Sequence, residues 1–174
     1  MARHDEMPFV YDDGGRAAAG YKGKAGDCGT RAVAIATGVP YQTVYEAINA
    51  EAQKERPRGK AKRSDARNGV WPKTLGRVLE AHGFRWVPTM RIGSGATVHL
   101  VPGELPARGR LVVRVSRHYT AVIDGVIRDT HDPQRTTLHL GADGGVDRVS
   151  HRCVYGMWAD HEALQFLRAT EVAR

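Results

Sequence analysis

The sequence has 174 residues, of which 41% are hydrophobic, enough for one domain with its own core. Its formal net charge of +7 admits nucleic acid or an acidic molecule as a partner. No run approaches the ~18 apolar residues of a membrane span, and residues 1–6 lack the apolar stretch of a secretory signal, so we expect a cytoplasmic protein.

The first half of the chain is predicted to be helical. Residues 1–25 contain several glycines and few apolar side chains, which is typical of an extended, loop-rich arm. We expect a single domain over residues 26–174. Apolar residues at helical spacing and turn residues at the ends predict helices at about residues 28–37, 40–54 and 72–82.

A basic loop is predicted at about residues 55–69, and it includes most of a Lys- and Arg-rich run at residues 54–63. Such a run could contact nucleic acid or an acidic partner, but it contains no aromatic residues to stack on bases. A solvated loop explains the same composition. Residues 67–71 could line a cleft, although turn residues before a helix would give the same pattern.

The second half of the chain is predicted to form a sheet. Asp124 and Gly125 lie between two β-branched runs, which indicates a two-residue hairpin. The predicted strands lie at about residues 84–87, 97–101, 110–115, 118–123, 126–130 and 153–158, before a closing helix at about 160–170. The loop at residues 93–95 is a further candidate for lining a cleft. Helices followed by an antiparallel sheet define an α+β fold with a cleft between its two halves.

Cys28 is the strongest candidate for a reactive residue. It follows Asp27, a good N-cap residue, at the first position of a predicted helix. Unpaired backbone N–H groups and the helix dipole favour the thiolate there, whereas the adjacent Asp27 carboxylate raises the pKa of the thiol. A small buried apolar residue is the alternative interpretation of Cys28. Cys28 and Cys153 form no Cys-x-x-Cys pair, so we expect free thiols.

The predicted hairpin supplies a base and a residue to orient it. With the turn at residues 124–125, His118 lies opposite His131, and Asp129 becomes a diagonal neighbour of His118 on the same face. A carboxylate bonded to one ring nitrogen leaves the other nitrogen free to take a thiol proton. Asp132 is the alternative orienting residue, because a bend in the chain could return it to that face.

These motifs, in the order Cys, His and Asp, resemble those of papain-like cysteine peptidases in their compact bacterial and phage form. A closer likeness is to an uncharacterised bacterial and phage group with Asp-Cys-x-x-Arg-Ala, Ser-x-His and Asp-Gly-x-x-x-Asp-Thr elements. Those elements begin here at Asp27, Ser116 and Asp124. The likeness covers about residues 26–158. It implies a papain-like fold, with N-terminal helices on a C-terminal antiparallel sheet, and a triad of Cys28, His118 and Asp129.

One residue that the resemblance implies is missing. Papain-like enzymes usually carry a glutamine shortly before the cysteine, and its amide stabilises the oxyanion. Lys22 lies six residues before Cys28, and no Gln or Asn occurs in residues 1–41. The Cys28 N–H could still donate, with Lys22, Lys24 or Tyr21 as a second donor. Because losing one oxyanion donor typically costs on the order of 10²–10³ in rate, we expect modest turnover on generic peptides.

The sequence thus predicts a thiol hydrolase that forms an acyl-enzyme with a specific protein or peptide and cleaves an amide or isopeptide bond, without a cofactor. A papain-like domain that only binds a protein or peptide is the first alternative, and nucleic-acid binding through the basic loop is the second. A metal site is the third. The histidines show no i, i+4 helical pair or Cys-x-x-Cys partner, so we expect none from His99, His118, His131, His139, His151 and His161.

Overall fold

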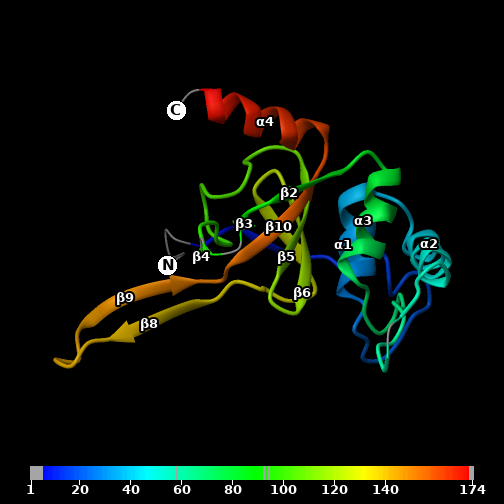
Figure 1. Ribbon diagram of the computed structural model, residues 1–174, viewed down its shortest axis with the longest axis horizontal. Helices are drawn as coiled ribbons and strands as arrows, with labels where there is room; N and C mark the ends of the chain where they lie inside the picture. The colour runs from blue at the N-terminus through cyan, green and yellow to red at the C-terminus, as the bar shows by residue number, and fades with distance from the viewer. Residues whose placement is uncertain (1–5, 58, 92, 94, 173–174) are drawn as a thin grey trace.

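The computed structural model describes residues 6–57, 59–91, 93 and 95–172. Within this part the chain is an α+β protein with a mostly antiparallel sheet (Figure 1). Its elements are β1 (Phe9–Tyr11), α1 (Cys28–Thr37), α2 (Tyr41–Gln53), α3 (Pro72–Ala81), β2 (Arg85–Pro88), β3 (Met90–Arg91), β4 (Gly95–Ala96), β5 (Arg110–Val115), β6 (His118–Ile123), β7 (Val126–Asp129), β8 (Thr136–Leu140), β9 (Val146–His151), β10 (Val154–Ala159) and α4 (His161–Val172). The three predicted N-terminal helices are confirmed, with shifts of one residue or less at most ends.

The main sheet has six strands in the order β1-β7-β6-β5-β10-β2. The predicted hairpin is confirmed, since Ile123 pairs with Val126. Both turn residues have positive φ, 49° at Asp124 and 76° at Gly125. Asp and Gly are among the few residues that adopt this conformation readily, and it matches the twist of a two-residue hairpin. The β6–β7 register is therefore fixed by the turn.

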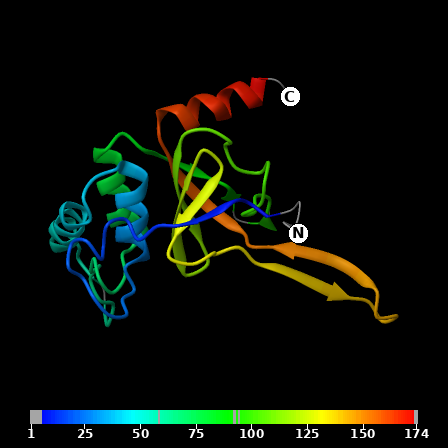
Figure 2. The ribbon, with the colours of Figure 1, turned by 180° about the vertical axis from the view of Figure 1, so that it is seen from behind.

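Helices α1 and α3 lie on one face of the sheet, and α2 packs on their outer side, as Figures 1 and 2 show. Helix α1 is buried from Gly29 to Ala36 and packs on β5 and β6. One apolar cluster joins its side chains to Leu75 and Leu79 of α3 and to Val112 of the sheet. A second cluster lies on the other face, under α4 and the loop that contains Leu100 and Leu105. The sheet is thus buried on both faces, and the helical layer holds α1 directly against β6.

The N-terminal arm takes part in the sheet, which the sequence did not predict. Strand β1 pairs in parallel with β7, with Tyr11 opposite Asp129. The backbone N–H of Asp12 donates to the carbonyl of Asp129 at 2.9 Å. Upstream, the Gln134 side chain bonds both backbone groups of buried Met7. The arm therefore supports the strand end that carries Asp129.

The predicted strand at residues 97–101 is wrong. The chain has only an isolated bridge there, between His99 and Cys153. Two further backbone hydrogen bonds join Val98 and Leu100 to residues 152–154, and Pro102 then begins a turn. The apolar pattern instead reflects the burial of Leu100 in the second cluster.

Strands β8 and β9 form a hairpin that extends away from the rest of the chain (Figures 1 and 2), and the sequence did not predict it. We call this hairpin, residues 136–151, the arm hairpin. Its cross-strand pairs Leu138–Val149 and Leu140–Val146 share one face. The two leucines are 55% and 67% exposed, respectively. Among the described residues, no helix combines the length and apolar character needed to cross a membrane.

Candidate active site

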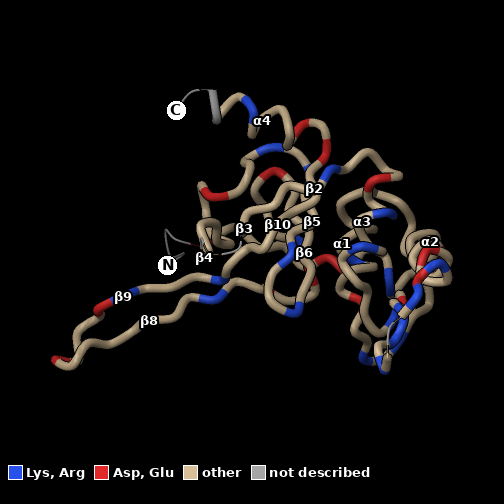
Figure 3. The backbone as a smooth tube through the Cα atoms, viewed as in Figure 1, with Lys and Arg blue, Asp and Glu red and all other residues tan. Residues whose placement is uncertain are grey.

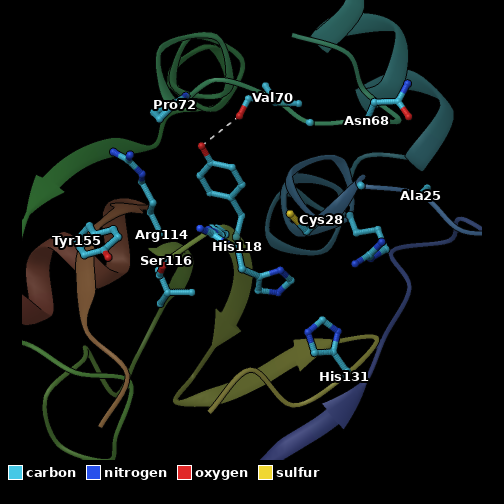
Figure 4. A pocket seen from close by; sticks show the side chains of 16 residues that line it. Ala25, Cys28, Asn68, Val70, Pro72, Arg114, Ser116, His118, His131 and Tyr155 are labelled. Carbon is cyan, nitrogen blue, oxygen red and sulfur yellow. Dashed lines mark hydrogen bonds between the residues drawn. The ribbon is translucent and has the colours of Figure 1, made fainter. Parts of the chain in front are cut away.

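A cavity of about 540 Å³ opens where the start of α1 meets the turn between β5 and β6 (Figure 4). Cys28 lies on its helical side, with residues 68–70, and His118 and His131 lie on its sheet side. Of residues 67–71, which the sequence offered as a possible cleft lining, residues 68–70 line the cavity, whereas Arg67 and Trp71 do not. Of the loop at 93–95, Ser94 lies outside the described residues, and Gly93 and Gly95 do not line the cavity.

Cys28 is the first residue of α1, as predicted, and its thiol is free. The thiol and the His118 ring both line the cavity (Figure 4), and interactions with that ring and with the backbone of Tyr119 affect the pKa of the thiol. Burial alone would raise the pKa of the thiol. The hydrogen bond and charge of His118, with the backbone of Tyr119 and the charge of Arg31, outweigh burial and lower the pKa below its ordinary value. These contacts favour the thiolate.

His118 begins β6, directly after a two-residue turn in which Arg117 has a φ of 56°. Its Nε2 lies 2.7 Å from Oδ2 of Asp129, so Nδ1 is the nitrogen left for the Cys28 thiol. Burial would lower the pKa of the ring. The bonds with Asp129 and Cys28 and their negative charges raise it to about 9. A positively charged ring is therefore favoured at neutral pH, beside a thiol whose pKa is lowered.

Asp129 ends β7 and is 3% exposed. Burial would raise the pKa of its carboxyl group, but the bond and charge of His118 and the backbone N–H of Thr130 lower it. Arg31 adds an ion pair with Asp129, at 3.6 Å from Nη2 to Oδ1. The expected hydrogen bond between Asp129 and His118 is therefore present.

Asp132, the alternative orienting residue, does not bond the His118 ring. It is exposed, and its carboxylate accepts from the backbone and side chain of Gln134. The bend that would have returned Asp132 to His118 instead closes a small turn on Gln134. The β6–β7 pairing ends at Arg128 and Ala121, so Asp132 lies beyond the paired strands.

The prediction of Asp27 as the N-cap residue of α1 is confirmed, although its side chain does not cap the helix. Asp27 occupies the N-cap position without a side-chain capping bond. Its buried carboxylate instead accepts from Arg31, from Nε of Arg16 at 2.8 Å and from the Tyr41 hydroxyl at 2.6 Å. Burial and this carboxylate raise the pKa of Tyr41 strongly. Two arginines thus offset the charge that was expected to oppose the Cys28 thiolate.

Lys22, Lys24 and Tyr21 do not lie where a second oxyanion donor is needed. None of them belongs to the described lining of the cavity, and both lysines are exposed. The Tyr21 hydroxyl donates to Gln42 at 2.6 Å. Arg16 bonds the carbonyls of residues 21–23 and folds this segment over the Asp27 network. The segment is therefore held away from the thiol.

Arg31 and Tyr119 are site residues that sequence reasoning did not single out. Arg31 lines the cavity and bridges the carboxylates of Asp27 and Asp129. The sequence feature that could have identified Arg31 is its position four residues, about one helical turn, after Asp27. The Tyr119 hydroxyl donates to the Val70 carbonyl at 3.2 Å and so joins the two sides of the cavity. Burial is the main reason that the pKa of Tyr119 rises to about 12.

The described histidines form one group with the geometry of a metal site. Donor atoms of His118, Asp129 and His131 all lie within 4.8 Å of one another. Nε2 of His118, however, already bonds Asp129 at 2.7 Å, so a metal held by that nitrogen would have to break this bond. The other candidates have different contacts: His99 pairs with Glu104, and His139 with Ser150.

The basic loop is partly an element of the site. Its second half packs on α1, where the Thr30 hydroxyl donates to the carbonyl of buried Ala66 at 2.6 Å. Glu55 accepts from Ser64 and thereby closes the loop. The described basic side chains at residues 60–63 are exposed, and Arg58 lies outside the described residues. The loop thus positions residues 68–70 at the cavity. This role is separate from any contact that its basic side chains make with a partner.

No family model, curated protein or solved structure matches the chain. The arrangement of thiol, imidazole and carboxylate is therefore interpreted from its own geometry.

Proposed function

We propose that the protein is a thiol hydrolase with a papain-like fold, which cleaves an amide or isopeptide bond in a protein or peptide. The observation that supports this most is the chain of contacts from Cys28 through His118 to Asp129, at the edge of a cavity. A raised pKa of the His118 ring and a lowered pKa of the Cys28 thiol are the conditions for a nucleophile–base pair that works at neutral pH. A reducing compartment such as the cytoplasm would keep Cys28 reduced.

In the proposed reaction the Cys28 thiolate attacks the substrate carbonyl carbon and forms a tetrahedral intermediate. The Cys28 backbone N–H, unpaired in the first turn of α1, donates to the oxyanion. His118 then protonates the leaving nitrogen as the C–N bond breaks, which leaves a thioester. Neutral His118 next takes a proton from water, the hydroxide attacks the thioester, and the acid product leaves while the thiolate and imidazolium are restored. Asp129 holds the orientation of the His118 ring both while the thioester forms and while it is hydrolysed.

Purified wild-type protein and the Cys28→Ala variant, incubated with a degenerate peptide mixture, test this proposal. Mass spectrometry should find new peptide termini only with the wild type, and a covalent acyl adduct on Cys28 at early times. Cys28→Ala should fold normally, because the thiol is half-buried and packs little apolar surface. Equal digestion by both proteins, or none by either, would overturn the proposal.

A binding module of the same fold is the second candidate. The observation that favours it is the position of Lys22, Lys24 and Tyr21, which leaves no side chain among them to donate to an oxyanion. This candidate predicts that wild type and Cys28→Ala retain the same peptides with equal affinity and cleave none.

A further inference from the structure

A second cavity, of about 470 Å³, adjoins the candidate active site. The two cavities share the β5–β6 turn residues Ser116 and Arg117, together with His118 and His131. Only the second one reaches Arg135 and Arg152, at the base of the arm hairpin. Figure 3 shows basic residues at this base and at the nearby turn. The active-site cavity thus continues past His118 into a basic recess.

Arg152 is built into the wall of this recess. Its Nη1 donates to the Pro133 carbonyl at 2.8 Å, and its Nη2 donates to the Ser116 carbonyl at 2.7 Å. The guanidinium therefore ties the β5–β6 turn to the segment that follows β7. Its buried Nε has no partner among the described residues. Burial and the nearby charge of Arg135 lower the pKa of Arg152, which indicates two guanidinium groups close together.

The described lining of the two cavities contains no carboxylate. Its charged side chains are Arg31, Arg114, Arg117, Arg135 and Arg152, besides the two histidines. The Asp129 carboxylate is already bonded by His118 and paired with Arg31. The Asp132 carboxylate, next to His131 in the chain, accepts hydrogen bonds from Gln134. A concave surface of one charge sign attracts ligands of the opposite sign. Guanidinium groups moreover match the planar geometry of a carboxylate.

The position of the recess indicates which part of a substrate it would meet. In the proposed reaction, His118 protonates the leaving nitrogen, so the leaving group must lie on the His118 side of Cys28. The recess is lined by His118 but not by Cys28. A substrate whose carbonyl lies at the thiol therefore directs its leaving amine toward the arginines.

We propose that Arg117, Arg135 and Arg152 form a subsite for a carboxylate on the leaving-group side of a peptide substrate. This inference rests on the proposed function for the choice of side, whereas the anion subsite itself is independent of turnover. The carboxylate is an acidic side chain or the free C-terminus, and both present the same group to the arginines.

Binding to the Cys28→Ala protein tests the subsite without cleavage. Three hexapeptides with an uncharged dye are compared by fluorescence anisotropy, each with four alanines at the dye end. The first ends in two glutamates and an amide, the second in two glutamines and a free carboxylate, and the third in two glutamines and an amide. We expect at least one carboxylate probe to bind about fivefold to tenfold more tightly than the neutral one, the net scale of one hydrogen bond. The first two probes distinguish an acidic side chain from a C-terminus.

Two substitutions, Arg135→Gln and Arg117→Gln, are made separately in the Cys28→Ala background. Each should reduce the preference for the carboxylate probe over the neutral probe to about twofold or less, because both arginines are exposed and line the recess. Arg168→Gln on α4 is the matched control, since it removes the same charge from another surface. Equal binding of all three probes, or equal loss with Arg168→Gln, would overturn the subsite. If the preference for a carboxylate probe persists but the wild type cleaves no peptide, the proposed hydrolase activity is wrong and the anion subsite is still supported.

Discussion

At the scale of single residues, the site depends on opposite shifts of two neighbouring groups. Cys28 gains negative charge because its pKa is lowered, and His118 keeps its positive charge because its pKa is raised to about 9. Each shift depends on the other and on Asp129, so the pair titrates as a unit. Between the two pKa values the thiolate and the imidazolium coexist, which is the form that attacks a carbonyl and then protonates the leaving nitrogen.

Asp129→Asn should move the Cys28 pKa upward. Without the carboxylate, the His118 ring is charged over a narrower range below pH 9, and a less charged ring stabilises the thiolate less. The pH midpoint of Cys28 alkylation by iodoacetamide, followed by mass spectrometry, should rise by about one unit. Asp132→Asn is the control and should leave the midpoint unchanged, because Asp132 bonds only Gln134. The reverse order of effects would show that Asp132 orients the ring.

At the scale of elements, strands β2 and β10 approach each other closely at the edge of the sheet. This packing holds that edge against the helices. Gly156 of β10 lies under the ring of Trp86, and that ring packs against Trp158 with centroids 4.5 Å apart. Gly76 of α3 lies against the same Trp158, so a second glycine brings the helix close to the sheet. Two small residues thus make room for two large ones.

Gly156→Ala should destabilise the protein by about 1–3 kcal/mol, as for other overpacked positions. A Cβ at this position would overlap the Trp86 ring, which must then leave its contact with Trp158. Urea unfolding measures the change. The control is Gly145→Ala at the tip of the arm hairpin, where the nearest neighbour is the Asp143 side chain at 3.3 Å. Equal midpoints for both variants would show that Trp86 is free to move.

At the scale of the whole molecule, the arm hairpin stands apart from both apolar clusters. Its residues from 136 to 140 are exposed or half-buried, and its strands pair with each other. The side chains that form the site and the recess lie outside the segment 138–149. The outer part of the hairpin is thus separable from the domain.

Replacing residues 138–149 with an Asn-Gly turn should therefore change the melting temperature by about 2 °C or less. A loss of 1 kcal/mol in stability would lower the melting temperature of a domain of this size by more than that. The Thr137–Ser150 pair remains to close the shortened hairpin. The alkylation rate of Cys28 should also stay the same. A large drop in melting temperature would mean that the outer hairpin contributes to the folded core.

The sequence predicted those parts of the site that depend on local geometry. A glycine-flanked helix start places Cys28, and a two-residue turn fixes the register between His118 and Asp129. It did not predict β1 or the contacts of Asp27, because these depend on segments far apart in the chain. Strand β1 has three exposed residues and no alternation of burial, so its pattern carries little information. The Asp27 network also joins Arg16 and Tyr41, and no helical period relates these two residues to Asp27.

The parallel pairing of β1 with β7 has a consequence for the order in which a growing chain can fold. Phe9 pairs with Ile127, more than a hundred residues later, so the N-terminal strand leaves the ribosome long before its partner exists. Such distant pairing is slow to form, and domains fold as units once their elements are available. Any chain released before residue 118 carries the thiol of Cys28 but not the base that would activate it. A truncated product of translation would therefore lack the activated thiolate of the folded site.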